Sequence, residues 1–148
     1  MTTERITTPL RPSGAMVAVI SQSPDGPRYL LLHSAEYVPG KAGDWEWGPP
    51  SGCIEPDEDI ATCATRELFE ETGIRGEPQP VATEDIGWAL FFLNVPWGTA
   101  VRLDAAEHND FAWVTFEDAC RMCRPERVAE GFRIAVEAAR MSHRGPSI

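Results

Sequence analysis

The segment GCIEPDEDIATCATRELFEETGI, residues 52–74, contains the clearest helix signal in the chain. Apolar residues recur at helical spacing from Ile60 onward, after an acidic stretch. Asp57 is suited to cap the N-terminus of a helix, Glu58 suits the positive end of the helix dipole, and Gly73 is a typical stop signal. The segment therefore predicts a helix over residues 58–72.

Three glutamates lie close together on this predicted helix. At about 100° per residue around the helix axis, measured from Ile60, Glu67 lies at about 340°, Glu70 at about 280° and Glu71 at about 20°. They border an apolar stripe that should face the core, formed by Ile60, Ala61, Ala64 and Leu68. The nearest cation in the sequence is Arg66, and one arginine does not neutralise three carboxylates.

Clustered carboxylates beside an apolar surface raise each other's pKa unless a cation compensates. Mg²⁺ prefers oxygen ligands and is typically held by a few carboxylates together with substrate phosphates. The cluster therefore predicts a site for Mg²⁺, with Mn²⁺ as an alternative because both ions favour oxygen ligands. A solvated acidic helix face remains the competing interpretation, since runs of charge are usually soluble surface.

The whole segment resembles the signature of the Nudix hydrolase family, G-x5-E-x7-R-E-U-x-E-E-x-G-U, where U is aliphatic. Gly52, Glu58, residues 66–73 and Ile74 match every specified position. The resemblance implies an α/β/α sandwich with a mixed central β-sheet. We expect residues 1–148 to form a single domain of this α/β class, in which residues 1–13 are a flexible N-terminal arm.

The resemblance also implies roles for individual residues of the helix. Glu70 and Glu71 match the main metal-ligand carboxylates of the family, and Glu67 matches a residue that binds metal or acts as the catalytic base. Arg66 matches the arginine that pairs with a motif glutamate and orients it. The motif carboxylates would thus hold the metal directly, and the arginine would act through them.

Further implied contacts lie outside the glutamate cluster. Glu58 is expected to bridge the helix start to the preceding loop and to help bind metal, and the backbone carbonyl of Ser51 or Gly52 is expected to reach the metal. The implied reaction is hydrolysis of a nucleoside diphosphate linked to another moiety. For the base that activates water, the loop offers Glu107 as the first candidate and Asp110 as the second.

The residues just before the motif bear on the substrate. DWEWGPPSGCIEPDE, residues 44–58, resembles the pattern of the family branch that cleaves dinucleoside polyphosphates. Ser51 stands where that branch usually has lysine and Cys53 where it usually has histidine, so a phosphate-pairing cation is missing. A dinucleoside polyphosphate or a nucleoside triphosphate is the favoured substrate, with Ser51 as one contact.

Aromatic residues near the motif are candidates for nucleobase binding. Trp45, Trp47 and Tyr37 present π-faces on which any base could stack, and packing within a strand or loop is the alternative. Two other functions remain open: a non-catalytic Nudix-like nucleotide sensor, and an enzyme like the isopentenyl diphosphate isomerases, for which Cys53 would matter. Turnover, and the products formed, would separate the three.

The remaining sequence predicts strands and helices in the order that such a sandwich needs. Two apolar runs separated by a Pro- and Gly-containing turn predict a β-hairpin, and Trp88, Phe91 and Phe92 are expected in the core. The predicted strands cover residues 15–20, 28–34, 45–47, 81–95, 99–103 and 110–116, and the further helices cover residues 116–123 and 125–141.

Charge and composition narrow the class of partner. The 148 residues include 13 basic and 23 acidic side chains, for a formal net charge of −10. This balance argues against a polymeric nucleic acid as partner, because such binding needs a basic surface. No long apolar stretch follows the N-terminus, so we expect a cytoplasmic protein without a membrane segment. Family resemblance makes a homodimer the expected assembly.

Overall fold

The computed structural model describes residues 12–40, 45–83 and 87–143. Most of the expected N-terminal arm therefore lies outside the described residues. The strands are β1 (Gly14–Ser23), β2 (Gly26–Ser34), β3 (Trp47–Gly48), β4 (Ser51–Cys53), β5 (Gln79–Val81), β6 (Trp88–Val95) and β7 (His108–Val114), and the helices are α1 (Ile60–Thr72), α2 (Phe116–Met122) and α3 (Glu126–His143).

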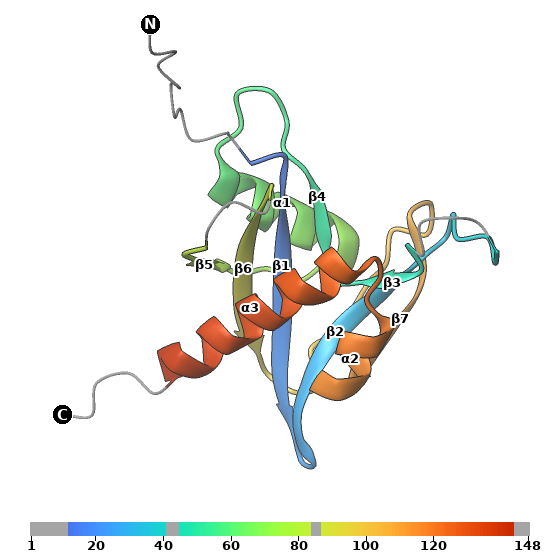
Figure 1. The fold of residues 1–148 in the computed structure, drawn as a ribbon, viewed down its shortest axis with the longest axis vertical. Helices are drawn as coiled ribbons and strands as arrows, with labels where there is room; N and C mark the ends of the chain where they lie inside the picture. The colour runs from blue at the N-terminus through green and yellow to red at the C-terminus, as the bar shows by residue number, and fades with distance from the viewer. Residues whose placement is uncertain (1–11, 41–44, 84–86, 144–148) are drawn as a thin grey trace, which may run out of the picture.

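The strands form one mixed sheet between two helical layers (Figure 1). The order is β3-β2-β1-β6-β5, with β4 paired to β1 and β7 paired to β2. β1 and β6 run parallel, with Val17 opposite Phe91, and the other strand pairs are antiparallel. In Figure 1, α3 crosses one face of the sheet and α1 lies behind the other, which confirms the expected α/β/α sandwich.

Alternation along β1 divides the core between the two faces of the sheet. Met16 and Ala18 belong to the cluster beneath α2 and α3, where Phe132 packs edge-on against Tyr29 at a centroid distance of 5.4 Å. Val17 belongs to the cluster beneath α1. Because β1 is buried on both faces, it reads as a continuous apolar run rather than as an alternating strand.

The start of α1 differs from the sequence prediction. The helix begins at Ile60, and its N-cap is Asp59, whose carboxylate accepts from the Thr62 N–H at 2.9 Å. Asp57, the predicted cap, has a φ of 64° and lies in the turn before the helix. The predicted end is confirmed, because Gly73 adopts the left-handed conformation and its N–H donates to the Phe69 carbonyl.

The side that α1 buries is also shifted from the predicted stripe. Ala61 is exposed, and the buried residues are Cys63, Ala64, Leu68, Glu71 and Thr72. The buried side of α1 is therefore centred close to Glu71, whereas the sequence predicted Glu71 at its border. A carboxylate occupies a position where a helix normally places an apolar side chain.

Two further predictions were wrong. Residues 99–103, all described, form no strand, because the Arg102 N–H donates to the carbonyl of Thr72 at the end of α1 instead of to a sheet. Trp88 is half-buried rather than in the core, whereas Phe91 and Phe92 are buried as expected. The hairpin and the two later helices are confirmed.

Within the described ranges, no helix has both the length and the apolar character needed to span a membrane. The single-domain organisation and the homodimer stay predictions.

Phe132 gives a direct test of the α3 face of the core. Its side chain has no exposed surface and contacts the rings of Tyr29 and Phe116. Replacing Phe132 by alanine should lower the free energy of unfolding by about 3–5 kcal/mol, through lost burial and the cavity left behind. Urea unfolding measures this change, and exposed Met141→Ala should shift stability by less than about 0.5 kcal/mol.

Candidate active site

The short strand β4 and the helix α1 approach each other unusually closely. A Cβ atom added to Gly52 would lie 2.0 Å from the carboxyl carbon of Glu67. A Cβ added to Gly14, the β1 partner of this segment, would lie 2.3 Å from the Gly52 carbonyl oxygen. Only glycine fits at both positions, and this contact sets the Glu67 carboxylate against the backbone of β4.

Arg66 lies at the centre of the carboxylate cluster. Its guanidinium donates to both oxygens of Glu58, at 2.6 and 2.9 Å, and to one oxygen each of Glu67, at 2.8 Å, and Glu70, at 3.2 Å. The hydrogen bonds from Arg66 hold the pKa of Glu58 at about 2. Glu58 therefore links the residues before α1 to the helix, and its role as a metal ligand stays a prediction.

Glu71 has no contact with Arg66. Its side chain is 4% exposed, and one oxygen accepts the Ser51 N–H at 3.1 Å. Burial raises its pKa to about 9, and the neighbouring carboxylate of Glu67 adds to the rise. Burial also raises the pKa of Glu67. Two motif carboxylates with raised pKa values thus lie side by side, and Arg66 contacts Glu67 but forms no ion pair with Glu71.

A second segment brings further ligand atoms to the same place. Glu107 and His108, at the start of β7, offer side-chain atoms that lie within 4.8 Å of each other and of Glu71. The loop is anchored by the Ala35 N–H, which donates to the Glu107 carbonyl at 2.9 Å. Asp110, the second candidate base, is exposed and its carboxylate accepts the N–H of its own neighbour Phe111.

This donor set suits a hard divalent cation. Carboxylate oxygens from Glu67, Glu71 and Glu107 predominate, with one imidazole nearby, and the burial of Glu71 makes a compensating cation favourable. Burial lowers the pKa of His108, so its ring is neutral near pH 7 and able to act as a ligand. Glu70 is a further carboxylate, at the exposed edge of the cluster.

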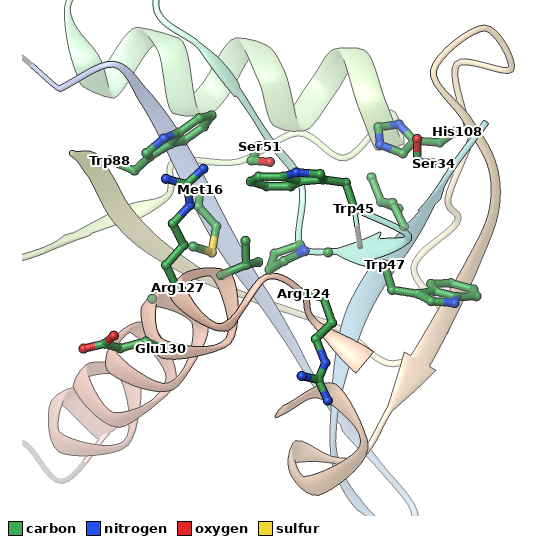
Figure 2. Close-up of a pocket in the computed structure, with 15 residues that line it drawn as sticks. Met16, Ser34, Trp45, Trp47, Ser51, Trp88, His108, Arg124, Arg127 and Glu130 are labelled. Carbon is green, nitrogen blue, oxygen red and sulfur yellow. The ribbon is translucent and has the colours of Figure 1, made fainter. Parts of the chain in front are cut away.

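An apolar cavity of about 260 Å³ opens beside the carboxylates (Figure 2). It lies between the sheet and the N-terminal part of α3. The fifteen lining residues are Met16, Leu32, Ser34, Trp45, Trp47, Gly48, Pro49, Ser51, Trp88, His108, Arg124, Arg127, Val128, Glu130 and Gly131. Ser51 joins the two parts of the site, because its backbone binds Glu71 while the residue lines the cavity.

The aromatic candidates divide between two cavities. Trp45 and Trp47 line the apolar cavity together with Ser51. Tyr37 lines a neighbouring, more open cavity, which it shares with Trp47 and Arg124. His33 packs between these groups, with its ring 4.9 Å from that of Trp47.

Sequence reasoning missed several residues of this cavity. Trp88 is expected in the core from the sequence, and neither His108 nor the arginines at the start of α3 are predicted as site residues. For Trp88 the available signal was the alternation of side chains along β6. Trp88 is the first residue of this strand and shares a face of the sheet with Leu90 and Phe92. Nothing local in the sequence marks Arg124 or Arg127 as cavity residues.

A family model described as the NUDIX domain matches residues 11–136 of the chain. The chain belongs to the NUDIX family. It is a NUDIX hydrolase that acts on phosphoanhydride bonds, and members of the family generally use a divalent metal, in agreement with the carboxylate cluster.

Individual relatives are more distant. The asymmetrical bis(5'-nucleosyl)-tetraphosphatase of Mus musculus is 28% identical over 109 residues, which cover 65% of this chain and 69% of that protein. Phosphatase NudJ of Escherichia coli K12 is 48% identical over 52 residues, covering 35% of this chain and 31% of that protein. The match to phosphatase NudJ therefore covers only about a third of this chain and about a third of that protein.

Solved structures agree on the fold. A C. elegans Ap4A hydrolase in a binary complex superposes with a TM-score of 0.66 at 22% identity, covering 88% of this chain and 97% of that one. The E. coli dihydroneopterin triphosphate pyrophosphohydrolase gives a TM-score of 0.66 at 16% identity, covering 84% and 95%. At these identities the likeness concerns the NUDIX fold alone.

Burial of Glu71 predicts a pH-dependent stability. Without metal, the free energy of unfolding should fall as the pH rises from about 5 to about 9. The folded protein holds a proton on Glu71 up to a pKa of about 9, whereas the unfolded chain releases it near the ordinary glutamate pKa of 4.5. The slope for one such proton is at most about 1.4 kcal/mol per pH unit, and urea unfolding in EDTA at several pH values measures it.

Two variants isolate the contribution of this carboxyl group. Glu71→Gln removes the titrating group and should reduce the slope, whereas Glu77→Gln, at an exposed position beyond α1, should leave it unchanged. Added divalent metal should stabilise the wild type most at the alkaline end, because binding requires the deprotonated ligand. Equal slopes for wild type and Glu71→Gln would contradict the assignment.

Proposed function

We propose that this NUDIX hydrolase is a Mg²⁺-dependent pyrophosphohydrolase that cleaves a nucleoside diphosphate linked to another moiety. The observation that carries the proposal is the convergence of Glu67, Glu71 and Glu107 beside an aromatic cavity. Mn²⁺ is the alternative ion, because the same oxygen ligands suit it.

A dinucleoside polyphosphate or a nucleoside triphosphate is the favoured substrate. Trp45, Trp47 and Trp88 line a cavity in which a nucleobase has π-faces to stack on, and Ser51 stands between that cavity and the carboxylates. The mouse relative is by name a bis(5'-nucleosyl)-tetraphosphatase, and this supports the same substrate class for the present chain.

The proposed roles rest on the motif resemblance, and the positions of several side chains support them. Glu67, Glu70 and Glu71 hold the metal, with the carbonyl of Ser51 or Gly52 as a further ligand and Glu58 as an additional candidate. Arg66 orients Glu67 and Glu70 through its hydrogen bonds. When bound, the metal neutralises phosphate charge and lowers the pKa of an attacking water.

Glu107 is the proposed proton acceptor. It is more exposed than Glu71 and is carried by a different segment, so it can meet water at the cluster without supporting the helix. A carboxylate in this position takes the proton from water as the phosphoanhydride bond is attacked. The buried Glu71 is poorly suited to this task, because solvent does not reach it.

The first test is product analysis with Mg²⁺ present, using diadenosine tetraphosphate, nucleoside triphosphates, ADP-ribose and a nucleotide sugar. Glu70→Gln should lower turnover of the accepted substrate at least about a hundredfold, since it removes a proposed metal ligand at an exposed position that folding tolerates. Glu77→Gln serves as the control. Nucleotide binding without turnover of any substrate would favour a sensor instead, and rearrangement without phosphate release would favour an isomerase.

A second pair of variants tests the base. Glu107→Gln should lower kcat about 10²- to 10⁴-fold and remove the acidic limb of the pH–rate profile, because the proton acceptor is lost. Asp110→Asn should leave both unchanged, since Asp110 stands apart from the carboxylate cluster. Loss of activity in Asp110→Asn alone would move the base to Asp110.

A further inference from the structure

The charged groups of the apolar cavity come from one side. Apart from His108, the charged or titratable lining residues are Arg124, Arg127 and Glu130, all at the α2–α3 junction or on α3. On the opposite side the lining includes Ser51, whose N–H donates to the Glu71 carboxylate. Among the described residues that line the cavity, positive charge therefore comes only from the α2–α3 junction and α3.

Of these charged residues, Arg127 is the one aimed into the cavity. Figure 2 shows its side chain leaving α3 and pointing toward Trp88, with the Trp45 ring and Ser51 to one side of it. Glu130 points the opposite way and Arg124 points away from Trp45 in the same view. The guanidinium carbon of Arg127 lies 5.3 Å from the centre of the Trp45 ring.

The donors of Arg127 are not used within the described part of the protein. Arg66, Arg121, Arg133 and Arg140 each form ion pairs with carboxylates. Arg127 has only the contact with the Trp45 ring, which leaves the N–H donors in its plane without an acceptor. Other described arginines, such as Arg75 over the Phe69 ring, also form no ion pair with a described carboxylate, so Arg127 stands out by its place in the cavity.

The carboxylate side of the site offers no substitute for this cation. Arg66 is occupied by Glu58, Glu67 and Glu70, and position 51 carries a short uncharged serine. A phosphate that extends beyond the metal therefore needs a donor from the other wall. A guanidinium suits this need, because its planar donors bind phosphate oxygens in pairs.

We propose that Arg127 binds a phosphate of the substrate that the metal does not hold, and so makes the enzyme selective for chains of three or more phosphates. The proposal rests on the proposed function in that the metal holds one part of the same phosphate chain. The Trp45 ring lies against the guanidinium, and in this account the N–H donors of Arg127 bind the phosphate oxygens. Arg127 is a substrate-binding residue in this account, with no part in the proton transfer.

Calorimetric titration with Mg²⁺ and inorganic tripolyphosphate or pyrophosphate tests the proposal without assuming a nucleobase. Arg127→Gln should weaken tripolyphosphate binding about ten- to hundredfold and change pyrophosphate binding far less. Arg127→Lys should restore part of the loss, because it keeps the charge without the paired donors. The matched control is Arg140→Gln, also on α3, whose guanidinium lies 4.7 Å from the Phe116 ring.

The outcomes separate this proposal from the proposed function. A selective loss of tripolyphosphate binding in Arg127→Gln supports it, even if none of the offered nucleotides is turned over. Equal binding by wild type and Arg127→Gln, equal losses for both phosphates, or no tripolyphosphate binding by the wild type would each overturn it, even if hydrolysis is found. Where turnover is found, Arg127→Gln should raise KM for long chains and leave kcat nearly unchanged.

Discussion

The contact between a carboxylate and the backbone of β4 organises the whole site. Because Gly52 has no side chain, Glu67 lies directly against the strand, and Arg66 can then reach Glu58, Glu67 and Glu70 with one guanidinium. The helix is thereby fixed in its rotation about its own axis. That rotation places the next carboxylate, Glu71, in the buried interface, where it destabilises the metal-free protein and favours a bound cation.

The helix and its carboxylates could be predicted because their signals are local. The glycine stop, the apolar spacing and the clustering of glutamates all lie within residues 52–74, and in the structure they belong to one helix and the turn before it. The error at the helix start arose because two nearby aspartates, Asp57 and Asp59, are both suited to the N-cap position. The Asp59 carboxylate accepts hydrogen bonds from both the N–H and the hydroxyl of Thr62, and this makes Asp59 the better cap. Asp57 instead lies in the turn before the helix.

The cavity could not be predicted in the same way, because it depends on contacts between distant segments. Trp88 and Arg127 are separated by 39 positions in the numbering and meet only when α3 packs across the sheet. Residues 99–103 illustrate the same limit. They are rich in strand formers, yet the Arg102 N–H finds its acceptor at the end of α1, so tertiary context overrides the local preference.

The negative charge of the protein and the negative charge of the proposed substrate repel each other. A formal charge of −10 repels a polyphosphate at long range, but the Debye length of about 8 Å at physiological ionic strength limits that repulsion to nearby groups. Within that distance Arg66 pairs with Glu58, Glu67 and Glu70, and the Arg127 guanidinium, which has no carboxylate partner among the described residues, projects into the cavity. Polymeric nucleic acid needs many phosphate contacts over a basic surface, whereas the short phosphate chain of the proposed substrate needs only a few, so the proposed function is compatible with an acidic chain.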